Sequence, residues 1–333
     1  MTEFLDICYD AIKMQEKSIP LTIAAVDDAS VSVLNDKKKI IFVGCGDSFA
    51  AADYGRWAFF NTGLNIHTMF PDEIKYLRLD KNSIVVGITA SGRSLATIDA
   101  LQRSKAQGAT IVVLTDNADG AACLEADYIW ITKSRVKTYN TSPSAPTTAA
   151  IAYLLGVASK LGVADNRIDR DIQKLMSSGK EMVTWAEVEG KGISQLASPN
   201  VPIYLISEGP NYVAAQIGMM KFNEFSILKG IAANREEFRH HYNLSINDGD
   251  GAVLISNSPI ESADSSYMKV LTDTLKMKAY HLYTNDKLNL EHPLVQAIPN
   301  MIALQMASYY TVLRFDPNKE SFKASHAEAF KIY

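Results

Sequence analysis

Residues 89–94 (TASGRS) are the segment whose residue types best suit the binding of an anion. They follow an apolar run at 83–88, which is typical of a buried strand, and they precede a predicted helix at 95–108. The unpaired N–H groups of a helix's first turn attract anions, and hydroxyl groups add further donors. The candidate phosphate-binding residues here are Thr89, Ser91, Gly92 and Ser94. The same residue types also cap helices when no ligand is present, so the loop alone leaves both interpretations open.

A second turn of this kind, residues 44–48 (GCGDS), follows the apolar run at 40–43. Its glycines indicate that the backbone approaches a ligand closely. Glycine at a strand-to-helix turn is, however, often needed only to avoid a steric clash. Gly46 and Ser48 are the candidate ligand contacts in it. Because ligands bind at the carboxyl ends of parallel strands, we expect the two loops to lie side by side and form one site.

Apolar runs alternate with helical stretches along the chain, and this order predicts an α/β fold with parallel sheets. Strands are expected near 40–44, 66–70, 83–88, 109–115 and 128–131, after a leading helix at 3–16 and before a long helix at 147–161. The cycle restarts with strands near 202–207, 252–256 and 278–283, and with helices at 212–227 and 293–314. We therefore predict a helical segment (1–34), a first lobe (35–165), a helical bridge (166–199) and a second lobe (200–333).

Composition excludes several classes of function. The chain of 333 residues has a formal net charge of −4 and no basic cluster, so we expect no nucleic-acid partner. The three cysteines are widely spaced without a CxxC pair, which argues against disulfides and zinc and favours the reducing cytoplasm. No apolar run reaches the roughly 18–20 residues that a membrane span needs. Neither a P-loop nor a dinucleotide fingerprint occurs, and we expect no cofactor and no metal.

The predicted second lobe contains residue types suited to proton transfer. Lys221 and Glu224 are three residues apart, so they share one face of the predicted helix at 212–227. The alternative is an exposed ion pair of the kind that contributes little to stability. His240, next to His241, is a candidate for proton exchange, because an imidazole can take up and release protons near neutral pH, or it is simply a solvated histidine.

These segments together resemble the double-SIS (sugar isomerase) family. Residues 43–48, 87–97 and 109–117 are similar to the first half of a SIS domain. Residues 218–224 (GMMKFNE) and 236–240 (EEFRH) resemble the family patterns G-x-x-K-x-x-E and E-[LF]-x-H-G. The resemblance covers nearly all of residues 35–333. It includes the isomerase domain of glucosamine-6-phosphate synthase, phosphosugar deaminases and fructosamine-6-phosphate deglycases, and it implies two tandem flavodoxin-like, three-layer αβα lobes.

The resemblance also implies roles for individual residues. Glu224 would move a proton between C1 and C2 of an open-chain phosphosugar, with Lys221 among the substrate-binding residues. His240 would assist ring opening, often in the neighbouring subunit's site, which implies a homodimer. A lysine near the carboxyl terminus would close over the sugar; Lys331 is the choice here, with Lys323 as the alternative. Ser142 matches a third substrate segment.

Several departures from the family pattern leave the reaction open. Ala90 stands where the synthase has glutamine, Arg93 replaces an acidic residue, and His241 replaces the glycine after His240. An isomerase, a deaminase and a deglycase therefore stay alternatives within one class of phosphosugar chemistry. A non-catalytic sugar-phosphate regulator is the alternative from a different class. The presence of Glu224, His240 and a terminal lysine favours catalysis.

Overall fold

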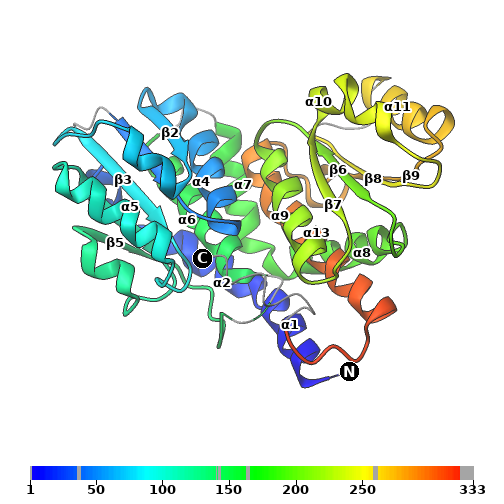
Figure 1. Ribbon diagram of the computed structural model, residues 1–333, viewed down its shortest axis with the longest axis horizontal. Helices are drawn as coiled ribbons and strands as arrows, with labels where there is room; N and C mark the ends of the chain where they lie inside the picture. The colour runs from blue at the N-terminus through cyan, green and yellow to red at the C-terminus, as the bar shows by residue number, and fades with distance from the viewer. Residues whose placement is uncertain are drawn as a thin grey trace.

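The computed structural model describes residues 2–35, 39–139, 141, 144–162, 166–257 and 262–322. Two parallel sheets lie on opposite sides of the molecule, with helices between them (Figure 1). Helices α6 (Ala145–Lys160), α9 (Tyr212–Glu224) and α13 (Pro293–Phe315) occupy this central region. The predicted α/β class with two parallel-sheet lobes is therefore confirmed.

The first lobe contains a five-stranded parallel sheet. Its strands are β1 (Lys39–Val43), β2 (Asn65–Met69), β3 (Ser83–Ile88), β4 (Thr110–Thr115) and β5 (Tyr128–Ile131). Their spatial order is β2-β1-β3-β4-β5, which is the order of a flavodoxin-like sheet. Every residue of the central strand β3 is buried, as expected for an apolar run covered by helices on both faces. The flanking helices include α4 (Asp47–Ala58) and α5 (Leu95–Ala106).

The second lobe repeats this arrangement with four parallel strands. They are β6 (Ile203–Ser207), β7 (Gly230–Asn234), β8 (Gly251–Ile255) and β9 (Lys278–Leu282), in the order β7-β6-β8-β9. Strand β7 was not predicted, because its sequence GIAAN lacks a run of β-branched or aromatic residues. The other helices of this lobe are α10 (Arg235–His240), α11 (Ser262–Lys269) and α12 (Asn285–Leu288).

The remaining α-helices come before the first sheet or between the two sheets in the chain. They are α1 (Glu3–Lys13), α2 (Gln15–Ala24), α3 (Asp28–Ser32), α7 (Asn166–Ser177) and α8 (Gly179–Ser194). The leading segment therefore forms two helices with a break at Met14, where one was predicted. Short 3-10 helices occur at Phe60–Thr62, Pro71–Tyr76, Ala121–Glu125, Gly209–Asn211 and Tyr242–Ser245, and a π-helical turn at Val270–Thr274.

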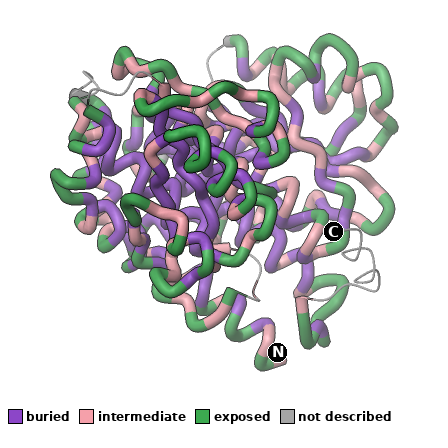
Figure 2. The backbone as a smooth tube through the Cα atoms, turned by 60° about the vertical axis from the view of Figure 1, so that its left-hand side comes forward, coloured by how far each residue is buried: buried purple, intermediate pink, exposed green. Residues whose placement is uncertain are grey.

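A single hydrophobic cluster spans both lobes. It contains Ile40 and Val86 from the first sheet together with Leu205 and Val253 from the second. Helix α13 contacts α8, α9 and α6, and buried residues run continuously through the middle of the molecule (Figure 2). Packing of this shared core holds the two lobes in one relative orientation. Within the part of the chain that the structure describes, no helix is long and apolar enough to span a bilayer.

Candidate functional site

The loop at residues 89–94 follows β3 and is anchored to the end of β4. The Thr89 N–H donates to the Leu114 carbonyl oxygen at 3.1 Å, and the Asp116 N–H donates to the Ala90 carbonyl oxygen at 3.1 Å. The Asn117 Nδ2 group donates to the Ser91 carbonyl oxygen at 2.9 Å. These bonds to the main chain of the loop hold it in place, and none of them uses the hydroxyl of Thr89 or Ser91.

Gly92 and Ser94 serve the local structure of this loop. Gly92 has φ of 69°, and a Cβ there would lie 2.6 Å from the Cα of Gly120. The absence of a side chain at Gly92 therefore lets the loop approach another backbone segment. Ser94 caps α5: its Oγ accepts from the Thr97 N–H at 3.5 Å and from the Thr97 hydroxyl at 3.0 Å. The capping interpretation thus accounts for Ser94.

The glycine turn after β1 lies beside this loop, as predicted. Strands β1 and β3 are paired in register, with Val43 opposite Gly87, so their carboxyl ends are adjacent. Gly46 precedes α4 with φ of 55° and ψ of −125°, a conformation that favours glycine. Helix α4 then begins at Asp47 and carries Ser48 in its first turn.

The two loops and the segment after β5 enclose a pocket lined mainly by hydroxyls. Its volume is about 200 Å³, and its lining residues are Ser48, Thr89, Ala90, Ser91, Thr138, Tyr139, Thr141, Ser144 and Pro146. The predicted residues Ser48, Thr89 and Ser91 are therefore brought together. Ser144 and Thr138 were missed; the only signal was the density of hydroxyl residues between the β5 strand and the α6 helix. Ser142 lies outside the described residues.

Asp116 organises the wall of this pocket that follows β5. Its carboxylate accepts from the Thr132 hydroxyl at 2.7 Å, the Ser134 hydroxyl at 2.5 Å and the Tyr139 hydroxyl at 3.2 Å. Burial, reinforced by the Asp116 carboxylate, raises the pKa of Tyr139 to about 12. The phenol therefore stays protonated and keeps donating at neutral pH. Arg93 is exposed, and its positive charge acts on Tyr139 in the opposite sense.

Lys221 lies at the contact between the lobes and is only 1% exposed. Its Nζ donates to Asp47 Oδ2 at 2.7 Å and to Glu224 Oε1. The Thr147 hydroxyl donates to the same oxygen of Asp47 at 3.0 Å. The interpretation of Lys221 and Glu224 as an exposed ion pair is therefore wrong for Lys221, because helix α4 packs over this face of α9.

We refer to Asp47, Lys221 and Glu224 as the interlobe cluster. Burial favours the neutral lysine, but the two carboxylates outweigh it and raise the pKa of Lys221. The lysine therefore carries its charge at neutral pH. The side chain of Glu224 is 34% exposed, so its carboxylate is accessible. Sequence reasoning missed Asp47, whose only signal was its place between Gly46 and Ser48.

The other predicted catalytic residues lie apart from this cluster or outside the described residues. His240 ends α10, is 70% exposed at its side chain, and has Nε2 at 3.5 Å from Glu236 Oε1. His241 contacts Glu237 at 3.4 Å and packs its ring on Tyr242. Both predicted terminal lysines, Lys323 and Lys331, lie outside the described residues.

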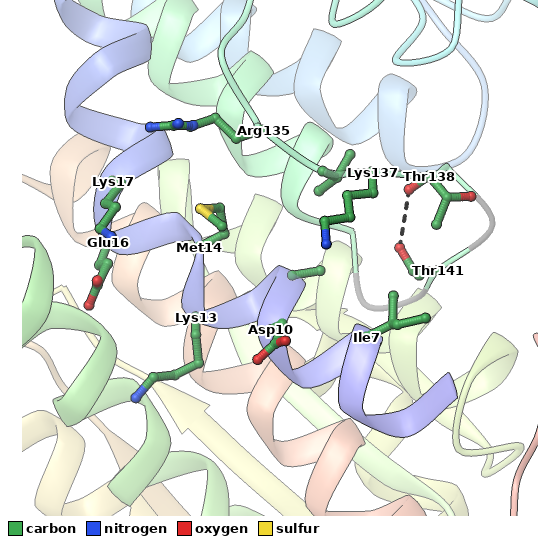
Figure 3. Close-up of a pocket in the computed structure, with 12 residues that line it drawn as sticks. Ile7, Asp10, Lys13, Met14, Glu16, Lys17, Arg135, Lys137, Thr138 and Thr141 are labelled. Atoms are coloured by element: carbon green, nitrogen blue, oxygen red, sulfur yellow. Dashed lines mark hydrogen bonds between the residues drawn. The ribbon is translucent and has the colours of Figure 1, made fainter. Parts of the chain in front are cut away.

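A larger cavity, of about 380 Å³, lies between helices α1 and α2 and the segment after β5 (Figure 3). It shares Thr138 and Thr141 with the hydroxyl-lined pocket. Figure 3 shows Lys137 extending from this segment towards the helices, while Asp10 and Lys13 belong to α1. Charges of both signs line this cavity, whereas the smaller pocket offers neutral donors at the carboxyl ends of β1 and β3. The smaller pocket therefore has two features that favour anions, namely neutral hydroxyl donors and the nearby amino-terminal ends of α4 and α5.

The described part of the chain offers no evident set of metal ligands. Within it, no group of three or more His, Cys, Asp or Glu side chains is arranged to hold a metal ion. The three cysteines form no disulfide, and Cys45 is the exposed one. Its Sγ lies 3.9 Å from the Ser94 Oγ, beside the first helical turns of α4 and α5.

The fold and the pocket define a class of protein: two flavodoxin-like lobes in tandem, with hydroxyl-bearing loops after the first and third strands. Residues 33–157, which contain the five-stranded sheet, match the family model described as the SIS domain. The predicted resemblance to SIS proteins is confirmed.

Relatives and solved structures extend this similarity across both lobes. The chain is 24% identical over 304 residues to glutamine–fructose-6-phosphate aminotransferase [isomerizing] of Sulfolobus acidocaldarius, covering 85% of this chain and 48% of that protein. The chain thus spans about half the length of the curated relatives it matches.

Two solved structures share the fold. The C-terminal domain of glucosamine-fructose-6-phosphate aminotransferase from Francisella tularensis superposes with a TM-score of 0.76 at 20% identity, covering 92% of this chain and 95% of that one. Glucosamine-6-phosphate deaminase from Thermotoga maritima superposes with a TM-score of 0.76 at 12% identity, covering 95% and 96%. At these identities the likeness establishes the fold of both lobes.

Proposed function

We propose that this chain is an enzyme that acts on a 6-phosphorylated sugar bearing an amine or an amine-linked group. The chemistry would run through the open-chain sugar and an enediol or enolamine. The observation that carries the proposal is the accessible carboxylate of Glu224, held by a buried lysine beside the helix that forms the phosphate pocket. The names of the similar proteins support the same class of substrate.

The phosphate would occupy the hydroxyl-lined pocket. Ser48, Thr89 and Ser91 would donate to its oxygens, and the first turn of α5, a helix of 12 residues, lies next to this loop. Neutral hydroxyl donors suit a dianion that must also be released after turnover, because each adds one hydrogen bond without an ion pair. Arg93 would add a charged donor at the rim of the pocket.

Glu224 would act as the single base for both proton transfers. It removes a proton from one of the two carbons C1 and C2, which leaves the electron pair in an enediol or enolamine. It then returns a proton to the adjacent carbon. A second proton moves from the oxygen or nitrogen on the first carbon to the carbonyl oxygen or imine nitrogen on the adjacent one, so the isomerisation is balanced without a cofactor. Charged Lys221 would hold the carboxylate of Glu224 in position through the hydrogen bond between them. Because its ammonium already contacts two carboxylates, Lys221 suits this role better than direct contact with phosphate.

The ring-opening group and the subunit arrangement complete the proposal. His240 is exposed at the end of α10, which would let it enter the site of a partner in a cytoplasmic homodimer. Lys331, or Lys323 in its place, would approach the open-chain carbonyl. The SIS lobes would comprise residues 35–165 and 200–333, joined by the bridge at 166–199. A strictly monomeric protein by light scattering would contradict the role of His240.

Isomerase, deaminase and deglycase outcomes differ only in what leaves the intermediate: nothing, ammonia or an amino acid. The test is turnover of fructose 6-phosphate, glucosamine 6-phosphate and a fructosamine 6-phosphate. We expect Glu224→Gln to lower kcat by about 10²–10⁴-fold on the accepted substrate, because the base is lost. Glu181→Gln, on the exposed side of α8, is the matched control and should keep wild-type activity. Wild-type turnover by Glu224→Gln, or no turnover of any of the three sugars, would refute the proposal.

A further inference from the structure

Asp47 is a carboxylate placed directly before Ser48, one of the hydroxyls that line the candidate phosphate pocket. It opens α4 between Gly46 and Ser48, at the edge of the candidate phosphate pocket. A carboxylate aimed into this pocket would repel a phosphate dianion. Asp47 instead contacts α9 of the other lobe, where its Oδ2 lies 2.7 Å from the Lys221 Nζ.

Two donors from different helices hold this carboxylate. The Lys221 ammonium comes from α9, and the Thr147 hydroxyl, at 3.0 Å, comes from α6. The side chain of Asp47 is 18% exposed and that of Lys221 is 2% exposed. The position of the lysine is therefore determined by tertiary contacts with the first lobe as well as by its own helix.

One buried ammonium thus serves two carboxylates. When both are ionised, the interlobe cluster carries one net negative charge. If Asp47 were neutral, the full charge of the lysine would act on Glu224 alone, and the nearby negative charge that opposes ionisation of Glu224 would be gone. Both changes stabilise the ionised form of Glu224 and make it a weaker base.

Other charged side chains on the helices against α9 are engaged elsewhere. On α4, Arg56 pairs with Asp53 at 2.8 Å. On α13, Arg314 donates to the Ser194 carbonyl oxygen. Beyond α13, the Lys319 ammonium lies 6.0 Å from the centre of the Phe225 ring and 3.7 Å from Asp316. Asp47 is accordingly the carboxylate that α4 brings to the Lys221–Glu224 pair.

We infer that Asp47 is a positioning residue for Glu224. Because Asp47 shares the Lys221 ammonium across the lobes, Glu224 is a stronger base than it would be if Lys221 contacted Glu224 alone. This inference rests on the proposed function of Glu224 as the base. It adds a residue from the first lobe to the proton-transfer machinery of the second, and it couples that machinery to the helix that carries Ser48.

The test is the titration of Glu224 in the whole chain, with and without the Asp47 charge. Asp47→Asn keeps the shape of the side chain and an acceptor for Thr147. The NMR signals of the carboxyl carbons of labelled glutamates are followed as the pH is changed. The signal of Glu224 is identified as the one that is missing in Glu224→Gln. For charges that share one ammonium, we expect Glu224 in Asp47→Asn to titrate roughly one to two pH units lower than in the wild type. Asp53→Asn, on the same helix, is the matched control and should leave the titration in place.

Kinetics supply the second readout. In Asp47→Asn, the acid limb of the pH profile of kcat/KM should shift to lower pH by the same amount as the titration of Glu224. Asp47→Glu should return this limb towards its wild-type pH. An unchanged titration of Glu224 in folded Asp47→Asn overturns the inference. If Asp47→Asn does not fold, Asp47→Ser is used instead, with the same expected shift. If neither variant folds, the role of Asp47 is purely structural and the inference is overturned. If no phosphosugar is turned over, the proposed function fails, while the NMR titration still decides the role of Asp47.

Discussion

Replacement of Lys221 by methionine tests the energetic role of the interlobe cluster. Methionine is similar in length and fills the same space, so the change removes the ammonium and leaves Asp47 and Glu224 facing an apolar chain. Removing one partner of a fully buried ion pair costs about 3–5 kcal/mol. Both carboxylates keep partial contact with water, with side chains 18% and 34% exposed, so we expect a loss of about 2–4 kcal/mol in the free energy of unfolding.

The pH dependence of this loss gives a second criterion. The pKa of Lys221 is raised in the folded state above its ordinary value of 10.5, so its stabilising contribution is fully present below pH 10.5. The contribution declines as pH rises through the higher folded-state pKa, where the wild-type lysine loses its charge. The stability difference between the wild type and Lys221→Met should therefore be constant near neutral pH and shrink above pH 10.5.

Urea unfolding at pH 7, followed by circular dichroism, measures the effect. Lys160→Met is the matched control: Lys160 pairs with Asp28 at 2.7 Å on the surface, with side chains 41% and 97% exposed. An exposed pair of this kind contributes about 0–1 kcal/mol. If Lys221→Met were no more destabilising than Lys160→Met, the reasoning that the buried ammonium stabilises the contact between the lobes would be refuted.

Two further predictions concern the phosphate loop. Ser91→Ala should weaken the binding of inorganic phosphate by about 10-fold in calorimetry, because one hydrogen bond to a charged group is lost. Ser32→Ala, at an exposed residue, is the control. If the two variants bound phosphate equally well, Ser91 would not be part of the phosphate site. Gly92→Ala should lower the free energy of unfolding by about 2–4 kcal/mol, because a Cβ there meets Gly120 at 2.6 Å and φ is 69°. Gly63→Ala has a similar φ of 76° but open space around it, so it should lower the free energy of unfolding by only about 1 kcal/mol. Thermal melts measure both variants, and equal losses of stability would show that the contact with Gly120 plays no role.

Much of the fold follows from local patterns in the sequence. Strands β1, β3 and β4 are buried apolar runs, and β-branched residues distinguish them from helix. Strand β7 has no such pattern, since alanine and glycine fit helix, strand and loop alike. Its place at the edge of the second sheet comes from pairing with β6, which is a contact between distant parts of the chain.

The candidate phosphate pocket was predictable for a related reason. Ser48, Thr89 and Ser91 lie directly after buried strands, and parallel strands end at the same edge of a sheet. The role of Gly92 was not predictable, because its close neighbour Gly120 belongs to the loop after β4. The position of His240 relative to a partner subunit stays a prediction.

The sequence by itself determined the alternation of strands and helices, the two hydroxyl-bearing loops and the shared helical face of Lys221 and Glu224. These are consequences of short-range periodicity, which a single sequence displays directly. Only the tertiary structure decided that Lys221 is buried between two carboxylates. Asp47 is 174 residues away in the chain, and it reaches the lysine because α4 of one lobe packs on α9 of the other. That packing depends on the core shared by both lobes, which no local pattern encodes.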